Sequence, residues 1–237
     1  MPNQRSLLCA LAISLTLGAS AAAQSVPASG RLSAAPGPSG QTLRIYLARH
    51  GETLYNAERR VQGQLDIPLN RRGLEQAAQL RDDLRGVAFD AIYASPMDRN
   101  ITTASIIGNG QPVRVLPDLI ERNQGRFQGM LADSAADFAR RMTDPRDDLD
   151  GGETTFALAA RAQRALTTIR RIHKSGAVLV VGHFLTNQML VKELLGMTVE
   201  RAMQVNQAND ELYLIEINPQ RRARSWKLIT PGKLGEL

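Results

Sequence analysis

Two histidines and two arginines of this 237-residue chain lie at or near the ends of apolar runs, where their side chains could do chemistry. Arg49 and His50 directly follow the first run, and His183 follows a later one. Arg99 lies about one helical turn beyond a third run. In an open α/β sheet the carboxyl ends of the strands face one crevice in which ligands bind. We therefore expect these four side chains to form a positively charged pocket, in which the planar fork of each arginine suits phosphate oxygens.

Hydrolysis of a phosphomonoester is a reaction that such a pocket would serve. The reaction is among the slowest known in water, and a route through a phosphohistidine divides it into two easier transfers. That route requires a neutral imidazole, cations around the phosphoryl oxygens and an acid for the leaving alcohol. His50 is the candidate nucleophile. Glu121, which follows the third predicted strand, is the candidate acid and would later act as the base for the attacking water.

The elements that must position these residues alternate between strands and helices. This alternation predicts an α/β fold with a doubly wound, mainly parallel sheet and helices on both of its faces. The two closing strands could form an antiparallel edge. The predicted strands span residues 43–48, 90–94, 113–116, 177–181, 211–217 and 224–229. The predicted helices span residues 72–84, 97–107, 134–142, 153–172 and 185–195.

Local signals set the expected ends of these helices. Ser95 is a natural cap for the second helix, with Pro96 in its first turn. Glu153 is expected in the first turn of the fourth helix, where the helix dipole favours a carboxylate. Gly196 is expected to close the fifth helix. Between residues 117 and 152 the pattern weakens, and we expect a lid or substrate loop there.

The composition is that of an ordinary globular protein, with 43% hydrophobic and 22% charged residues. The net charge of +6 favours anionic ligands. The basic residues are scattered along the chain, without the basic block or interleaved aromatics of a nucleic-acid groove. We therefore expect a small phosphorylated substrate and no nucleic-acid partner.

The N-terminus resembles a secretory signal peptide. Arg5 precedes an apolar segment over residues 7–17, and small residues follow up to Ala23. An uncleaved anchor is the alternative, but a membrane span needs about 18 or more apolar residues and this segment is shorter. We expect residues 1–23 to be a signal peptide cut after Ala23, a periplasmic or secreted mature protein, and no stable membrane insertion after cleavage.

Two further regions follow the expected cleavage site. Residues 24–41 are rich in Ser, Pro, Gly and Ala and are expected to form a flexible leader. Residues 42–237 are expected to form one domain. Cys9 is the only cysteine, and cleavage would remove it, so we expect no disulfide and no cysteine-based metal site in the mature protein.

The polar residues fall into blocks that occur in a fixed order. The blocks are Arg49-His50-Gly51-Glu52-Thr53 with Asn56, Gln62-Gly63-x-x-Asp66-x-Pro68-Leu69, Ser95-Pro96-x-x-Arg99, Glu121-x-x-x-Gly125, Gly152-Glu153-Thr154 and His183. In this order they resemble the signature of the histidine phosphatase superfamily, in its phosphoglycerate mutase-like branch. The resemblance covers essentially residues 43–229 and is carried by the ordered set rather than by any single block.

The resemblance implies a role for each of these positions. It implies a phosphoglycerate mutase-like three-layer sandwich that needs no metal and no cofactor. His50 would be the phosphorylated nucleophile and Glu121 the proton donor. The residues implied to bind the substrate are Arg49, Arg99 and His183 at the phosphoryl oxygens, with Asn56, Gln62 and Gly63 at the rim.

Phe184 departs from the family pattern. The family usually has a small residue, often glycine, directly after its second histidine, whereas this chain has a phenyl ring there. The ring would roof or narrow the pocket, so the substrate of a relative does not transfer directly to this chain.

We expect the chain to be an exported phosphatase that acts on phosphomonoesters through His50. A mutase that moves phosphate between hydroxyls uses the same site and is the first alternative. A phosphoester-binding module without turnover is the second alternative, although the retained histidines, arginines and Glu121 argue against it. The third histidine, His173, lies among basic residues at a predicted helix end and is expected to be structural.

Overall fold

The computed structural model describes residues 42–134, 137–220 and 222–229. The predicted signal peptide (1–23), the predicted leader (24–41) and the end of the predicted domain (230–237) lie outside these residues. Among the helices of the described ranges, none is both long and apolar enough to cross a membrane.

The described strands form a single mixed sheet of six, in the order β3-β2-β4-β1-β5-β6. The first four strands of this order are parallel to one another. The remaining two form an antiparallel edge, as predicted, because β5 runs antiparallel to β1 and β6 antiparallel to β5. The strands are β1 (Leu43–Arg49), β2 (Ala91–Ala94), β3 (Val113–Val115), β4 (Gly176–Gly182), β5 (Leu212–Ile217) and β6 (Ala223–Ile229).

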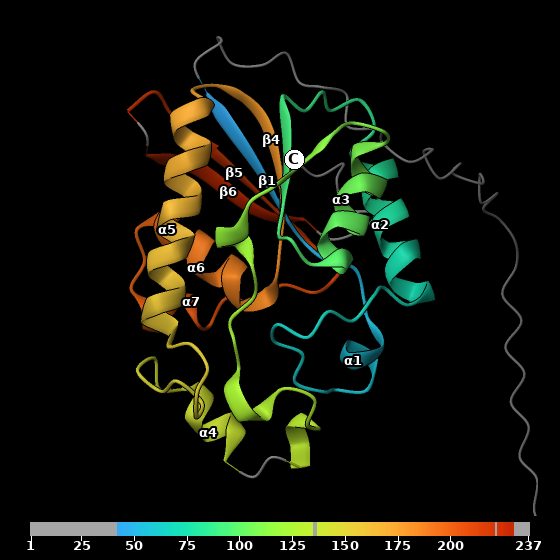
Figure 1. The fold of residues 1–237 in the computed structure, drawn as a ribbon. Helices are drawn as coiled ribbons and strands as arrows, with labels where there is room; N and C mark the ends of the chain where they lie inside the picture. Colours follow the sequence, from blue (N-terminus) through green and yellow to red (C-terminus); the bar gives the residue numbers. More distant parts are fainter. Residues whose placement is uncertain (1–41, 135–136, 221, 230–237) are drawn as a thin grey trace, which may run out of the picture.

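Helices cover both faces of the sheet, which confirms the predicted fold class. The long helices α5 and α6, with the short α7, lie on one face, and α2 and α3 lie on the other (Figure 1). The helices are α1 (Leu54–Ala57), α2 (Arg71–Asp83), α3 (Asp98–Gly108), α4 (Phe138–Met142), α5 (Thr155–Ile172), α6 (Phe184–Leu195) and α7 (Val199–Ala202). The short 3₁₀ turns are η1 (Pro117–Leu119), η2 (Gly125–Phe127) and η3 (Ala132–Ser134).

The side chains of β1 alternate between two hydrophobic clusters. Ile45 and Leu47 pack with α5 and α6, whereas Tyr46 and Ala48 pack with α2 and α3. The side chains of β4 alternate in the same way. A strand that is buried on both faces needs apolar residues at every position, which explains why neither run alternates with polar residues.

Two predicted helix starts are wrong. Met97, rather than Ser95, is the residue before α3, because the Ser95 hydroxyl accepts from the Met97 N–H and also bonds His183. Thr154 caps α5 through a bond from the Ala157 N–H, so Glu153 precedes the helix. The carboxylate of Glu153 instead pairs with Arg161 at 2.7 Å.

The region between β3 and α5 carries less helix than predicted. The helix predicted over 134–142 is the five-residue α4, which begins at Phe138. The 3₁₀ turns η1, η2 and η3 occupy much of the segment before it. Together with α1, α4 lies beyond the end of the sheet to which β1 leads (Figure 1). This is the place where the carboxyl ends of the parallel strands open.

Candidate active site

The turn that follows β1 holds His50 in a fixed position. The His50 N–H donates to the Gly182 carbonyl at 3.1 Å, so the end of β1 stays paired with the end of β4. A Cβ atom on Gly51 would overlap the carbonyl oxygen of Gly73, and one on Gly73 would overlap that of Glu52. The turn and the first turn of α2 therefore touch backbone to backbone, which only glycine permits at both positions.

The imidazole of His50 is oriented by its own turn. Its Nδ1 lies 2.8 Å from the Gly51 carbonyl oxygen. A carbonyl only accepts hydrogen bonds, so Nδ1 carries the proton and Nε2 keeps a free lone pair. Burial lowers the pKa of His50 well below 6.5, and the nearby cations Arg49 and Arg99 lower it further. The ring is therefore a neutral imidazole at physiological pH, as a nucleophile must be.

Arg99 is fully buried and is held by backbone carbonyl groups. Its Nη1 donates to Leu65 at 2.7 Å and its Nη2 to Gly63 at 2.9 Å. The amide orientation of Gln62 that satisfies both of its neighbours places its oxygen 2.6 Å from Arg99 Nε and its nitrogen against the Thr53 hydroxyl. These bonds fix the plane of the guanidinium and leave other N–H groups for a ligand.

Arg49 approaches the same site from the last residue of β1. Its Nη1 donates to the Gln207 carbonyl at 3.0 Å, and its guanidinium carbon lies 5.1 Å from the centre of the Phe184 ring. Burial lowers the pKa of Arg49 to about 10, and the opposing charge of Glu121 limits this fall. Arg49 therefore remains a cation at neutral pH.

His183 lies beside His50, and the ring centres are 5.1 Å apart. Its Nε2 lies 2.8 Å from the Ser95 hydroxyl oxygen. Its Nδ1 is buried and, within the described residues, has no hydrogen-bond partner. Burial lowers the pKa of His183 well below 6.5, and Arg99 adds to this effect. The four residues singled out by sequence thus come together at the ends of β1 and β4 and the first turn of α3.

Glu121 reaches the site from the segment after η1, and its carboxylate lies at the N-terminus of α6. Its Oε1 accepts from the backbone of Arg122 at 2.9 Å and from the backbone and hydroxyl of Thr186 at 3.1 and 3.0 Å. Its Oε2 accepts one bond, from the Leu185 N–H at 3.2 Å. The carboxylate is therefore fixed through Oε1, and Oε2 keeps a lone pair that can hold a proton.

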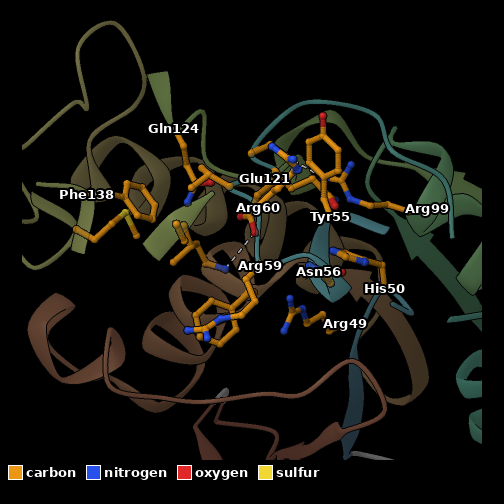
Figure 2. A pocket seen from close by; sticks show the side chains of 17 residues that line it. Arg49, His50, Tyr55, Asn56, Arg59, Arg60, Arg99, Glu121, Gln124 and Phe138 are labelled. Carbon is orange, nitrogen blue, oxygen red and sulfur yellow. Dashed lines mark hydrogen bonds between the residues drawn. The ribbon is translucent and has the colours of Figure 1, made fainter. Parts of the chain in front are cut away.

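Arg49, His50, Arg99 and Glu121 line a pocket of about 300 Å³, whereas His183 is fully buried behind them and is not part of its lining. Figure 2 shows Arg49, His50 and Arg99 toward one side of it, with Gln124 and Phe138 on the other. The pocket is lined by Arg49, His50, Tyr55, Asn56, Arg59, Arg60, Val61, Gln62, Gly63, Arg99, Glu121, Gln124, Ala132, Phe138, Met142, Phe184 and Leu185.

The three predicted rim residues all line the pocket, but they also serve the local structure. Asn56 completes a capping box with Thr53 at the start of α1, which uses its Oδ1. Gln62 contacts Arg99, and the Gly63 carbonyl accepts from Arg99. Gly63 has a φ of +52°, a conformation that favours glycine. Two of the predicted substrate contacts therefore also position the arginine.

Several polar residues that support the site were not predicted. Gln207 donates to the Leu47 carbonyl at 2.9 Å, and Asn187 donates to Ala48 at 3.0 Å and to the Gln207 side chain at 2.8 Å. Asn209 donates to the His50 carbonyl at 2.8 Å. Asn187 lies on α6, which directly follows His183, but Gln207 and Asn209 lie in a loop without any motif that would have indicated them.

In the described part of the chain, no group of three or more His, Cys, Asp or Glu side chains lies together as a metal-ligand set would.

A family comparison identifies the class of this protein. The model of the histidine phosphatase superfamily (branch 1) matches residues 45–228. The match covers most of the chain, which therefore belongs to this superfamily. The predicted resemblance is confirmed, and so is the phosphoglycerate mutase-like fold.

Two relatives that are similar in sequence to this chain are probable phosphoglycerate mutases. A probable phosphoglycerate mutase, GpmB, of Enterobacter sp. (strain 638) is 34% identical over 163 residues, which are 65% of this chain and 76% of the relative. GpmB of Salmonella choleraesuis (strain SC-B67) is 30% identical over 204 residues, which are 82% of this chain and 95% of the relative.

Two solved structures with the same fold are phosphatases by name. A putative α-ribazole-5′-P phosphatase from Escherichia coli has a TM-score of 0.71 at 26% identity, covering 79% of this chain and 96% of that one. A mycobacterial glucosyl-3-phosphoglycerate phosphatase has a TM-score of 0.70 at 25% identity, covering 80% of this chain and 98% of that one. The likeness alone does not choose between the two activities.

Proposed function

We propose that this protein is a phosphatase that hydrolyses phosphomonoesters through a phosphohistidine at Nε2 of His50. The hydrogen bond from Nδ1 to the Gly51 carbonyl carries the proposal, because it presents Nε2 as a lone pair. Arg49 and Arg99 stand on the same side of the pocket and would attract a phosphate dianion. A neutral nucleophile between two cations is the arrangement that phosphoryl transfer to histidine requires.

The reaction proceeds in two steps, phosphoryl transfer to His50 and then to water. In the first, His50 Nε2 forms a bond to phosphorus while the bond from phosphorus to the leaving oxygen breaks, and Glu121 gives a proton to that oxygen. In the second, Glu121 removes a proton from a water molecule, whose oxygen bonds to phosphorus as the bond to Nε2 breaks. The products are an alcohol and inorganic phosphate, and Glu121 ends each cycle protonated.

The surrounding residues stabilise the charge on the transferred group. Arg49, Arg99 and His183 donate to the phosphoryl oxygens, and Asn56, Gln62 and Gly63 lie around them. The guanidinium of Arg99 is already held by three acceptors, so it needs little reorganisation when the substrate binds. Preorganised donors of this kind contribute more to the rate than mobile ones.

A phosphoglycerate mutase is the second candidate, favoured by the names of the GpmB relatives. A mutase must bind the carboxylate of its acid substrate in addition to the phosphate. Outside the His50 end of the pocket, the lining cations Arg59 and Arg60 are each already paired, with Asp133 at 3.0 Å and Glu58 at 2.7 Å. The phosphatase is therefore the function that the pocket supports best.

Phosphate release from p-nitrophenyl phosphate tests the proposal. We expect the mature protein to release phosphate in the presence of EDTA, and His50→Ala to abolish the release. His173→Ala is the matched control, because His173 lies outside the pocket against Tyr93, and this variant should keep the wild-type rate. An unchanged rate for His50→Ala would reject the nucleophile, whereas isomerisation of a phosphoglycerate with a bisphosphorylated cofactor would favour the mutase.

We also propose that the protein is exported and that its mature form begins at Gln24. The charge and apolar pattern of residues 1–23 support this proposal. Expression of the full chain in a Gram-negative host should yield a periplasmic protein whose intact mass lacks residues 1–23. A chain without residues 1–23 should remain in the cytoplasm, and recovery of the full-length mass from the membrane would instead indicate an uncleaved anchor.

A further inference from the structure

Apolar side chains line the pocket both next to the catalytic residues and on its far side. Phe138 and Met142 come from α4, and Phe184 and Leu185 from the first turn of α6. We call these four residues the outer pocket. In Figure 2, Phe138 lies well apart from His50 and Arg99, across the hollow that the lining side chains enclose. A phosphate held at His50 would therefore direct its ester group toward the outer pocket.

Phe184 is fixed in this wall by its contact with Arg49. The guanidinium carbon of Arg49 lies 5.1 Å from the ring centre, a cation–π distance. Phe184 is the first residue of α6, directly after the buried His183, so the backbone that carries it is anchored. The ring therefore adds apolar surface to the pocket directly beside Arg49.

The charged residues around the outer pocket are already paired with one another. Arg59 bonds Asp133, and Arg60 bonds Glu58 and the Gly129 carbonyl. Two arginines of the same region, Arg126 and Arg141, both bond Asp150. Of the four arginines that line the pocket, Arg59 and Arg60 hold close acidic partners, Arg99 lies 3.7 Å from Asp66, and Arg49 has no ion pair within the described residues. A carboxylate in the outer pocket would have to compete for arginines that already hold acidic partners.

From these contacts we propose that the outer pocket binds the leaving group of the substrate and selects an uncharged, apolar one, an alkyl chain or an aryl ring. This inference rests on the proposed phosphatase function and names the substrate class of the same site. A pocket of about 300 Å³ is at the lower end of the range for small-molecule sites, so it suits a short chain or a single ring next to the phosphate.

The expected gain in kcat/KM follows from the free energy of moving methylene groups from water into the outer pocket. Burial of one methylene corresponds to about a fourfold gain in binding. The n-alkyl phosphates from ethyl to hexyl have leaving alcohols of nearly equal acidity, so their kcat/KM values compare binding of the chain rather than chemistry. We expect kcat/KM to rise by about two- to fourfold per methylene until the pocket is filled.

The n-alkyl phosphonates test the same pocket without turnover, since their C–P bond is not hydrolysed. Calorimetry should show the affinity for phosphonates rising with chain length by the same factor, and 3-phosphonopropionate should bind more weakly than propylphosphonate. An affinity that is independent of chain length, or a preference for the carboxylate, would overturn the inference.

Substitutions in the outer pocket test whether the gain in kcat/KM per methylene arises there. Phe184→Ala and Phe138→Ala should each reduce the gain per methylene to less than twofold, both in kcat/KM and in phosphonate affinity. Phe156→Ala removes a partly exposed ring of α5 that is not part of the pocket, and it should keep the wild-type gain. A wild-type gain in both pocket variants would show that the chain binds elsewhere and would overturn the inference.

The two proposals fail in different ways. If phosphonates bind with the expected dependence on chain length but no phosphate ester is hydrolysed, the outer pocket is supported and the phosphatase function is rejected. If esters are hydrolysed through His50 with no dependence on chain length, the phosphatase function stands and the outer pocket is rejected.

Discussion

Replacing Arg99 by lysine separates the charge of this residue from its geometry. In the wild type, Nη1 and Nη2 donate to the carbonyls of Leu65 and Gly63, and this fixes the fork that we propose binds the phosphoryl group. A lysine keeps the positive charge but has a single donor group on a flexible stem. The ammonium group cannot hold both carbonyls and also bond the phosphoryl oxygens in the geometry of a guanidinium.

The expected loss follows from the bonds that the lysine cannot make. A hydrogen bond that involves a charged group contributes about 1.5–3 kcal/mol. If one such bond is lost from the transition state, kcat/KM falls by about 10- to 160-fold, because about 1.4 kcal/mol corresponds to a factor of ten. Arg99→Lys should therefore reduce kcat/KM for p-nitrophenyl phosphate within this range.

The pH profile distinguishes charge from geometry. Arg99 is one of the causes that lower the pKa of His50, so Arg99→Lys should leave the acidic limb of kcat/KM in place. Arg99→Met removes the charge, so the pKa of His50 should rise and the acidic limb should move to higher pH. Thermal unfolding of both variants would confirm that they fold. A loss below threefold for Arg99→Lys, or equal shifts of the limb in both variants, would refute this reasoning.

Three further predictions follow from the buried contacts of the site. Gly51→Ala or Gly73→Ala should reduce the free energy of unfolding in urea by about 1–3 kcal/mol, since a Cβ would overlap backbone, and normal stability would contradict the close approach. The free energy of unfolding should also fall as the pH drops below 6.5, because His50 and His183 take up protons in the unfolded chain but not in the folded one. Each histidine should contribute a slope of up to about 1.4 kcal/mol per pH unit. A His50→Gln, His183→Gln double variant should lose this slope, and an unchanged slope would contradict the assignment. Glu121→Gln should reduce hydrolysis of alkyl phosphates more than that of p-nitrophenyl phosphate, and equal losses would remove Glu121 from the acid role.

Much of the fold could be predicted because its central strands, β1, β2 and β4, are buried on both faces. The apolar runs that end at Ala48 and at Val181 are β1 and β4, the adjacent central strands of the sheet. The helix starts were predicted less well. The sequence shows that Ser95 can cap a helix, but not that His183 lies 2.8 Å from its hydroxyl oxygen across 88 residues. A competing tertiary contact of this kind leaves no local signal.

The candidate site shows the same division between local and long-range information. His50, Arg99 and His183 were predictable because each stands in a short motif at or just after the end of a strand. The supporting contacts of Gln207 were not predictable, because they join a loop to β1 and α6 over long sequence distances. Phe184 was expected to roof or narrow the pocket, but Phe138 was not assigned to it, because for that region the sequence predicts only a helix within a lid or substrate loop.

Detection of a phosphoryl group on His50 tests the central claim most directly. The protein would be mixed with p-nitrophenyl phosphate, quenched within the first turnovers in alkaline denaturant, in which phosphohistidine survives, and digested for mass spectrometry. The account predicts one added phosphoryl group on the peptide that contains His50, at Nε2, and none in the His50→Asn variant. Turnover with no label on His50, or with the label on another residue, would contradict it.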